Sequence, residues 1–120
     1  MSVFHKFTKQ AKETGKVHPF EGSDEYLRDF IYVGDVCKII EKMMYIDEMG
    51  IWNVGTGTTT SFGSIANDIA NKYNATVQSI PMPTALQSQY QKYTCSDNTK
   101  LLKTLGDFKF TTPKEWIQNA

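Results

Sequence analysis

The residues best suited to chemistry lie in one stretch, Phe20–Val36, which reads FEGSDEYLRDFIYVGDV. Arg28 opens its β-branched and aromatic part, and a guanidinium at the mouth of a strand can donate two hydrogen bonds to one phosphate. Gly22 can take backbone angles closed to other residues, and Ser23 offers a hydroxyl and an exposed amide. The stretch predicts a rim for a phosphate-bearing ligand. A turn, a strand and an ordinary surface arginine would give the same pattern.

The elements around this stretch follow from local signals. Arg28–Val33 is expected to form a strand, Gly34 to turn the chain, and Asp35 to cap the next helix. That helix carries one apolar stripe at helical spacing, which we expect to be core: Val36, Ile39, Ile40, Met43 and Met44.

The rest of the chain reads as alternating helices and strands. We expect a helix over Ser2–Glu13 ended by Gly15, a buried strand at Ile51–Val54, and a helix over Phe62–Tyr73 capped by Thr60 or Ser61. A β-strand is expected at Thr76–Ile80, followed by a short helix over Asn98–Leu105 whose residues Leu101, Leu102 and Leu105 face inward. The last helix is expected to begin at Thr112, Pro113 and Glu115. This order is an α/β pattern within one partial domain, residues 1–120.

A glycine turn, Gly55-Thr56-Gly57, stands between a predicted strand and a predicted helix, as in dinucleotide-binding loops. The third glycine of G-x-G-x-x-G is replaced by Thr60, and no acidic residue stands near Thr76, about 20 residues on. We therefore predict no cofactor-binding residue in this chain, and no spacing suggests a metal ligand set.

Composition excludes several classes of protein. Thirteen basic and thirteen acidic side chains cancel, which argues against a nucleic-acid or anionic-membrane binder. Cys37 and Cys95 lie far apart and suggest neither a disulfide framework nor a metal knuckle. No apolar run approaches the roughly 20 residues that span a bilayer, and the start lacks a signal-peptide core, so a cytoplasmic location is expected.

Tyr90 and Tyr93 are two further candidates for ligand contact, in the polar segment from Gln87 to Asp97. A tyrosine ring offers a flat apolar face and a hydroxyl, which suits a nucleotide or a sugar. At this spacing the pair fits two packing aromatics equally well.

FEGS followed closely by RDFIYVGDV resembles the substrate-domain signature of the extended short-chain dehydrogenase/reductase family of nucleotide-sugar enzymes. Within it, the likeness is greatest to the 6-epimerases of ADP-glycero-manno-heptose, which serve lipopolysaccharide core heptose biosynthesis. The similarity runs from about Ser2 to Trp116. It implies the C-terminal, substrate-binding part of a Rossmann-type α/β fold, without the N-terminal dinucleotide-binding part.

The resemblance also implies ligand contacts. It assigns Phe20, Glu21, Gly22 and Ser23 to the sugar-nucleotide rim, Arg28 to the diphosphate of an ADP-sugar and Tyr90 to the ligand's surroundings. The family places a histidine on the first helix. Here His5 is the nearest histidine, but counting back from Gln10 puts Lys6 at that position, and one residue rotates a helical side chain by about 100°. A half-exposed helix histidine without a role fits His5 equally.

Reactions of such epimerases run through transient oxidation by bound NADP, with a tyrosine and a lysine in a Y-x-x-x-K arrangement. None of the six tyrosines here is followed by a lysine four residues later. We therefore expect no catalytic residue in this chain and no turnover by this piece alone. Two alternatives stay open. One is a catalytically inactive free-standing domain that binds a nucleotide sugar or serves as an assembly surface, and the other is another extended short-chain enzyme, such as a UDP-hexose epimerase or a dehydratase. The formation of a homo-oligomer is open in each case.

Overall fold

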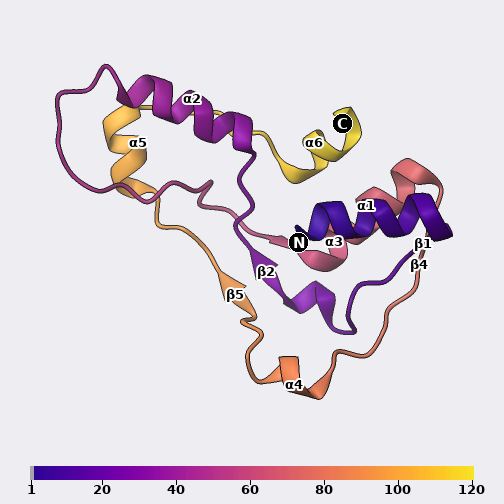
Figure 1. Ribbon diagram of the computed structural model, residues 1–120. Coiled ribbons are helices and arrows are strands. Elements are labelled where there is room, and N and C mark those ends of the chain that lie inside the picture. The colour runs from indigo at the N-terminus through magenta and orange to yellow at the C-terminus, as the bar shows by residue number, and fades with distance from the viewer. Residues whose placement is uncertain (1) are drawn as a thin grey trace.

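The structure, a computed structural model, describes residues 2–120 of the chain (Figure 1). Two helix–strand units lie side by side: α1 (Val3–Thr14) leads into β1 (Lys16–Val17), and α3 (Phe62–Tyr73) leads into β4 (Thr76–Val77). The two strands pair in parallel, with Val17 opposite Val77, and an isolated bridge between Phe20 and Ile80 extends the pairing. The predicted α/β character is confirmed.

Apolar faces of α1 and α3 meet to form the main core, with one side chain from the C-terminal helix α6 (Pro113–Asn119). The local stop and start signals act as predicted. Gly15 ends α1 in a left-handed conformation, with φ at 71°. The Ser61 hydroxyl accepts a hydrogen bond from the Ser64 amide at 3.0 Å and caps α3. The buried members of the core are Phe7, Ala11, Val17, Ile65, Ala66, Ile69, Ala70 and Ile117.

The strand predicted over Arg28–Val33 is much shorter. Strand β2 (Leu27–Arg28) lies between β3 (Thr60–Ser61), which runs antiparallel to it, and β5 (Tyr93–Thr94), which runs parallel. The Asp29 amide still donates to the Thr94 carbonyl at 3.1 Å, where the pairing ends. The prediction was wrong beyond Arg28, because β-branched residues form a strand only where a neighbouring strand accepts their backbone hydrogen bonds.

Helix α2 (Val33–Met43) begins earlier than predicted, so Asp35 lies in its first turn and does not cap it. Asp35 is buried and accepts two hydrogen bonds from Thr111, at 2.7 Å from the amide and 3.2 Å from the hydroxyl. Its carboxylate therefore holds the segment before α6 against α2.

The apolar stripe of α2 is only partly core. Ile39 is buried, but Ile40 is 58% exposed and Met44 is 77% exposed, so the predicted burial of these two was wrong. Ile51 is 86% exposed, and the strand predicted over Ile51–Val54 is absent from the described residues. No strand in residues 2–120 lies alongside this segment to pair with it. Ile40, Met44 and Ile51 are therefore apolar side chains that remain exposed in this part of the chain.

Four shorter elements complete the chain: η1 (Ser23–Glu25), α4 (Thr84–Gln87), α5 (Thr99–Leu105) and α6. Leu101 of α5 is buried as predicted, but Leu102 is partly exposed. Helix α6 begins as predicted, because the Thr112 hydroxyl accepts from the Glu115 amide at 3.1 Å. Figure 1 shows α2 and α5 on one side of the molecule, away from the α1–α3 core. None of the helices in the described part of the chain has the length and apolar character to cross a membrane.

Substitution of a buried and of an exposed isoleucine by alanine tests which residues form the core. Ile65→Ala should lower the free energy of unfolding by about 3 kcal/mol, because it leaves a cavity between α1 and α3. Ile40→Ala removes the same atoms from an exposed site and should change stability by about 0.5 kcal/mol or less. Urea unfolding of both variants measures the difference. Equal losses would contradict this assignment of the core.

Candidate functional site

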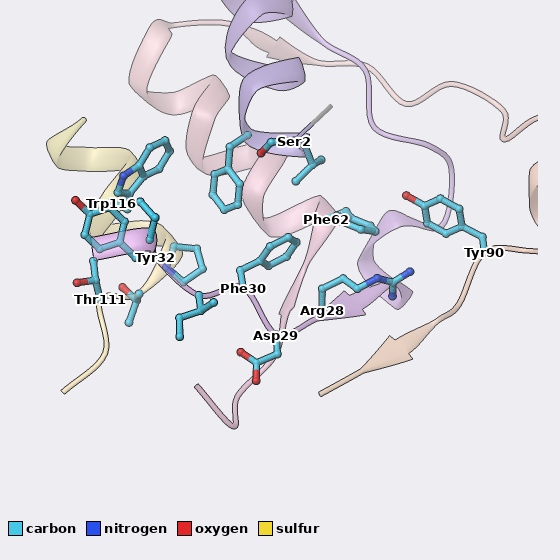
Figure 2. Close-up of a pocket in the computed structure, with 15 residues that line it drawn as sticks. Ser2, Arg28, Asp29, Phe30, Tyr32, Phe62, Tyr90, Thr111 and Trp116 are labelled. Atoms are coloured by element: carbon cyan, nitrogen blue, oxygen red, sulfur yellow. The ribbon is translucent and has the colours of Figure 1, made fainter. Parts of the chain in front are cut away.

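A cavity of about 610 Å³ lies beside β2 and is mostly apolar (Figure 2). The start of α1, the segment Arg28–Val33, the first residue of α3, the loop residue Tyr90 and the start of α6 line it. Figure 2 shows Trp116, Tyr32 and Thr111 gathered at one end, with Arg28 and Tyr90 at the other. A space of this size and character suits a small organic ligand.

Arg28 lies against two aromatic rings and has no carboxylate partner among the described residues. Its guanidinium carbon lies 5.2 Å from the centre of the Phe62 ring and 5.6 Å from that of Tyr90. One of its nitrogens donates to the Leu27 carbonyl at 2.9 Å, which leaves other donors of the planar group for a ligand. Among residues 2–120, the single ion pair joins Lys92 to Glu25, so no carboxylate neutralises Arg28.

Tyr90 is the central ring of an aromatic cluster that we define as Phe20, Tyr26, Phe62 and Tyr90. Its ring centre lies 5.0 Å from that of Tyr26, 5.9 Å from that of Phe62 and 6.2 Å from that of Phe20. Such tilted arrangements stabilise aromatic pairs. Tyr93 lies on β5, is 63% exposed and lines neither cavity of the site. Of the two tyrosines, Tyr90 is the one whose ring contacts the Arg28 guanidinium.

A second, smaller cavity adjoins the first and is lined in part by Phe20, Ser23 and Tyr90. Gly22 has φ at 79°, which explains the glycine in this turn. Ser23 is buried, however, and its amide donates to the Phe20 carbonyl at 3.1 Å, so the exposed amide predicted there was wrong. Glu21 and Gly22 are exposed and line neither cavity.

The first helix directs a lysine, and not its histidine, toward this site. Lys6 lines the smaller cavity, and its ammonium nitrogen lies 5.1 Å from the centre of the Phe20 ring. His5 is exposed and lines neither cavity. Counting back from Gln10 in the sequence predicts the same position for the helix residue that faces the ligand.

Asp29, next to Arg28, is a residue that the sequence did not single out. Its carboxylate accepts hydrogen bonds from the Thr56 hydroxyl at 2.6 Å and from the amides of Thr56, Gly57 and Ser96 at 3.0, 2.9 and 3.2 Å. Burial by itself would raise the pKa of Asp29, but these hydrogen bonds together hold its pKa below the ordinary value. Asp29 therefore joins the end of β2 to two distant loops.

The same contacts decide the role of the glycine turn. The amides of Thr56 and Gly57 already donate to Asp29, and a Cβ on Gly57 would meet the Asn98 side chain at 2.9 Å. A dinucleotide phosphate needs such amides free at a helix N-terminus. The residues of this turn therefore do not fit a cofactor phosphate.

The sequence is similar to known nucleotide-sugar enzymes. It is 33% identical, over 127 aligned positions, to the ADP-L-glycero-D-manno-heptose-6-epimerase of Alkalilimnicola ehrlichii, an alignment that spans 98% of this chain and 39% of the relative. No protein-family model matches the chain. The match therefore extends along nearly the whole chain but along less than half of the relative.

Solved structures of two such enzymes also match nearly the whole of this chain and less than half of their own chains. The fold matches the ADP-L-glycero-D-manno-heptose-6-epimerase of Helicobacter pylori with a TM-score of 0.79 at 24% identity, over 98% of this chain and 35% of that one. It matches UDP-glucose 4-epimerase of Thermotoga maritima, solved with UDP-glucose, with a TM-score of 0.77 at 25% identity, over 98% of this chain and 37% of that one.

The carboxylate of Asp29 should make folding depend on pH. Because its pKa is lower in the folded chain, its hydrogen bonds contribute stability above the unfolded pKa of about 4, and this contribution is lost as pH falls through the folded pKa. Asp29→Asn should lower the melting temperature at pH 7 and reduce the loss of stability on acidification. Asp107→Asn, at an exposed position, is the control. Identical pH profiles for Asp29→Asn and the native chain would refute this role.

Proposed function

We propose that these residues, which are similar in sequence and fold to part of nucleotide-sugar epimerases, form the substrate-binding portion of an NADP-dependent nucleotide-sugar epimerase. The proposed substrate is an ADP-linked heptose epimerised at carbon 6, in the cytoplasm, on the route to the lipopolysaccharide core. Residues 1–120 then form one partial domain, and the cofactor binds elsewhere in the enzyme.

The position of Arg28 carries this proposal. The guanidinium lies at the edge of the large cavity, against Phe62 and Tyr90, and no carboxylate pairs with it. A diphosphate offers pairs of oxygens that match the forked donors of arginine. The flat faces of neighbouring rings suit the base or the sugar of the same ligand. The charge of Arg28 and the ring of Tyr90 are therefore the groups that a nucleotide sugar would need at this site.

The chain's own contribution is binding and orientation. When bound elsewhere in the proposed enzyme, NADP would supply the hydride chemistry of the epimerisation. The glycine turn does not fit the phosphates of this cofactor, because its amides already donate to Asp29. The chain also has no Y-x-x-x-K pair that could supply the catalytic tyrosine and lysine. Arg28 and the aromatic cluster would hold the nucleotide end of the substrate, so that the sugar is presented to the reacting groups.

Two other functions are separable by experiment. A free-standing, inactive binding domain would be expected to bury its apolar residues in its own core, but Met49 is 97% exposed, and Ile40, Met44 and Ile51 are exposed as well. These exposed side chains favour a part of a larger enzyme over a self-contained binding domain. Another enzyme of the same class would use a different nucleotide sugar. Thermal stabilisation by ADP-glucose but not by UDP-glucose would favour the ADP-sugar, because a ligand stabilises the folded state that binds it.

Arg28→Gln should weaken binding of ADP-glucose about tenfold or more, because the charge-assisted hydrogen bonds to the diphosphate are lost. Lys92→Gln removes an exposed cation from the Lys92–Glu25 pair and should leave the affinity unchanged. Isothermal calorimetry measures both. An Arg28→Gln variant that binds as tightly as the native chain would refute the proposed site.

Joining this chain to the N-terminal part of the Alkalilimnicola ehrlichii epimerase should give epimerase activity on ADP-heptose. The chain alone should show none, because it lacks the tyrosine and lysine of the reaction. Chromatographic separation of the two epimers measures the conversion. A well-folded hybrid that binds NADP but remains inactive would argue for the free-standing binding domain.

A further inference from the structure

We propose that Tyr32 and Trp116 form the sugar-binding end of the large cavity and that this end selects an uncharged sugar. The inference rests on the proposed function, because it takes Arg28, at the other end of the same cavity, as the group that binds the diphosphate. It assigns the discrimination between sugars to two side chains that the arginine site does not use.

Both ends belong to one cavity of about 610 Å³ (Figure 2). Arg28 and Tyr32 are four residues apart, so their Cα atoms lie at most about 14 Å apart even if the segment between them is fully extended. With the diphosphate at Arg28 and the base against the aromatic cluster, the sugar is the part of the ligand that remains for the opposite end. That end is the one where Tyr32 and Trp116 lie.

Packing fixes the orientation of the two rings. The ring centre of Trp116 lies 5.3 Å from that of Phe4, and the ring centre of Phe4 lies 5.3 Å from that of Phe30, with neighbouring rings nearly perpendicular. The Tyr32 ring lies so close to Gly34 that a Cβ at that position would collide with it. Rings that are already held in place can bind the apolar face of a sugar with little further loss of side-chain freedom.

Polar atoms at this end are available to the hydroxyl groups of a sugar. Within residues 2–120, no protein group makes a hydrogen bond to the Tyr32 hydroxyl or the Trp116 indole nitrogen, whereas the indole nitrogen of Trp52 donates to the Thr104 hydroxyl at 3.0 Å. Tyr32 is 37% exposed, and Trp116 is partly buried. A sugar bound beside them therefore remains accessible to reacting groups elsewhere in the enzyme.

The described residues that line the cavity include one cation, Arg28, and one carboxylate, Asp29. Arg28 lies at the end opposite Trp116, and the Asp29 carboxylate already accepts hydrogen bonds from two loops. An uncharged sugar can enter the Trp116 end without needing a charged partner. A sugar that carries a carboxylate would lose water there without gaining a cation, which weakens its binding.

Calorimetry with ADP, ADP-glucose and ADP-glucuronate tests the inference. Tyr32→Phe removes one hydroxyl and should weaken ADP-glucose about fivefold but leave ADP unchanged, because ADP lacks the sugar. The native chain should bind ADP-glucuronate about tenfold more weakly than ADP-glucose. Tyr93→Phe, at an exposed tyrosine that lines neither cavity, is the matched control and should change no affinity.

Fluorescence reports on Trp116 directly in a chain that carries Trp52→Phe, because the chain has two tryptophans. The emission of Trp116 should shift to shorter wavelength when ADP-glucose binds and should not shift with ADP. The reason is that only the sugar excludes water from this ring.

The outcomes separate this inference from the proposed function. If Arg28→Gln weakens ADP-glucose but Tyr32→Phe binds it as the Tyr93→Phe control does, the sugar end is wrong and the arginine site stands. An equal loss of ADP and ADP-glucose affinity in Tyr32→Phe, or a Trp116 emission that responds equally to both ligands, would also overturn the sugar end. Equal affinities for ADP-glucose and ADP-glucuronate would overturn the selection of an uncharged sugar. If the native chain binds neither ADP nor ADP-glucose, both proposals are wrong.

Discussion

The Asp29 carboxylate is the contact on which the site's geometry depends. Three parts of the chain that are far apart in sequence meet at it: the end of β2, the turn at Thr56-Gly57 and the segment at Ser96. Strands of two residues contribute few backbone hydrogen bonds, so they cannot hold these segments in place alone. Charge-assisted bonds to one carboxylate supply that restraint. Because Asp29 is the residue after Arg28, these bonds also restrain the end of β2 that carries the Arg28 side chain.

Aromatic packing then decides where the positive charge of Arg28 lies. Phe62 begins α3 and Tyr90 follows α4, so the two rings reach the guanidinium from different parts of the chain. A cation between rings is oriented without being neutralised. A carboxylate partner would have held the side chain as firmly but would have competed with an anionic ligand. The site therefore combines a fixed geometry with a free charge.

The exposed side of α2 and the segment after it show what a partial α/β fold lacks. Ile51–Val54 has the composition of a buried strand, yet its backbone finds no neighbour in the described residues, and Ile51 remains in solvent. The chain spans 39% of the curated relative that it matches. An apolar strand needs neighbouring strands, and the apolar face of a helix needs another element packed on it, before their side chains are buried. The α1–α3 core, in contrast, is complete within the chain.

The sequence alone determined the positions of three helices and marked Arg28 as the main candidate for ligand binding. Periodic apolar residues and local caps such as Gly15 and Ser61 act within a few residues, so α1, α3 and α6 could be predicted, and Arg28 was recognisable from its neighbours. Only the tertiary structure decided the length of β2, the roles of Asp29 and Asp35, and the approach of Lys6 to Phe20. These features join residues distant along the chain, and local patterns carry no information on which distant groups will meet.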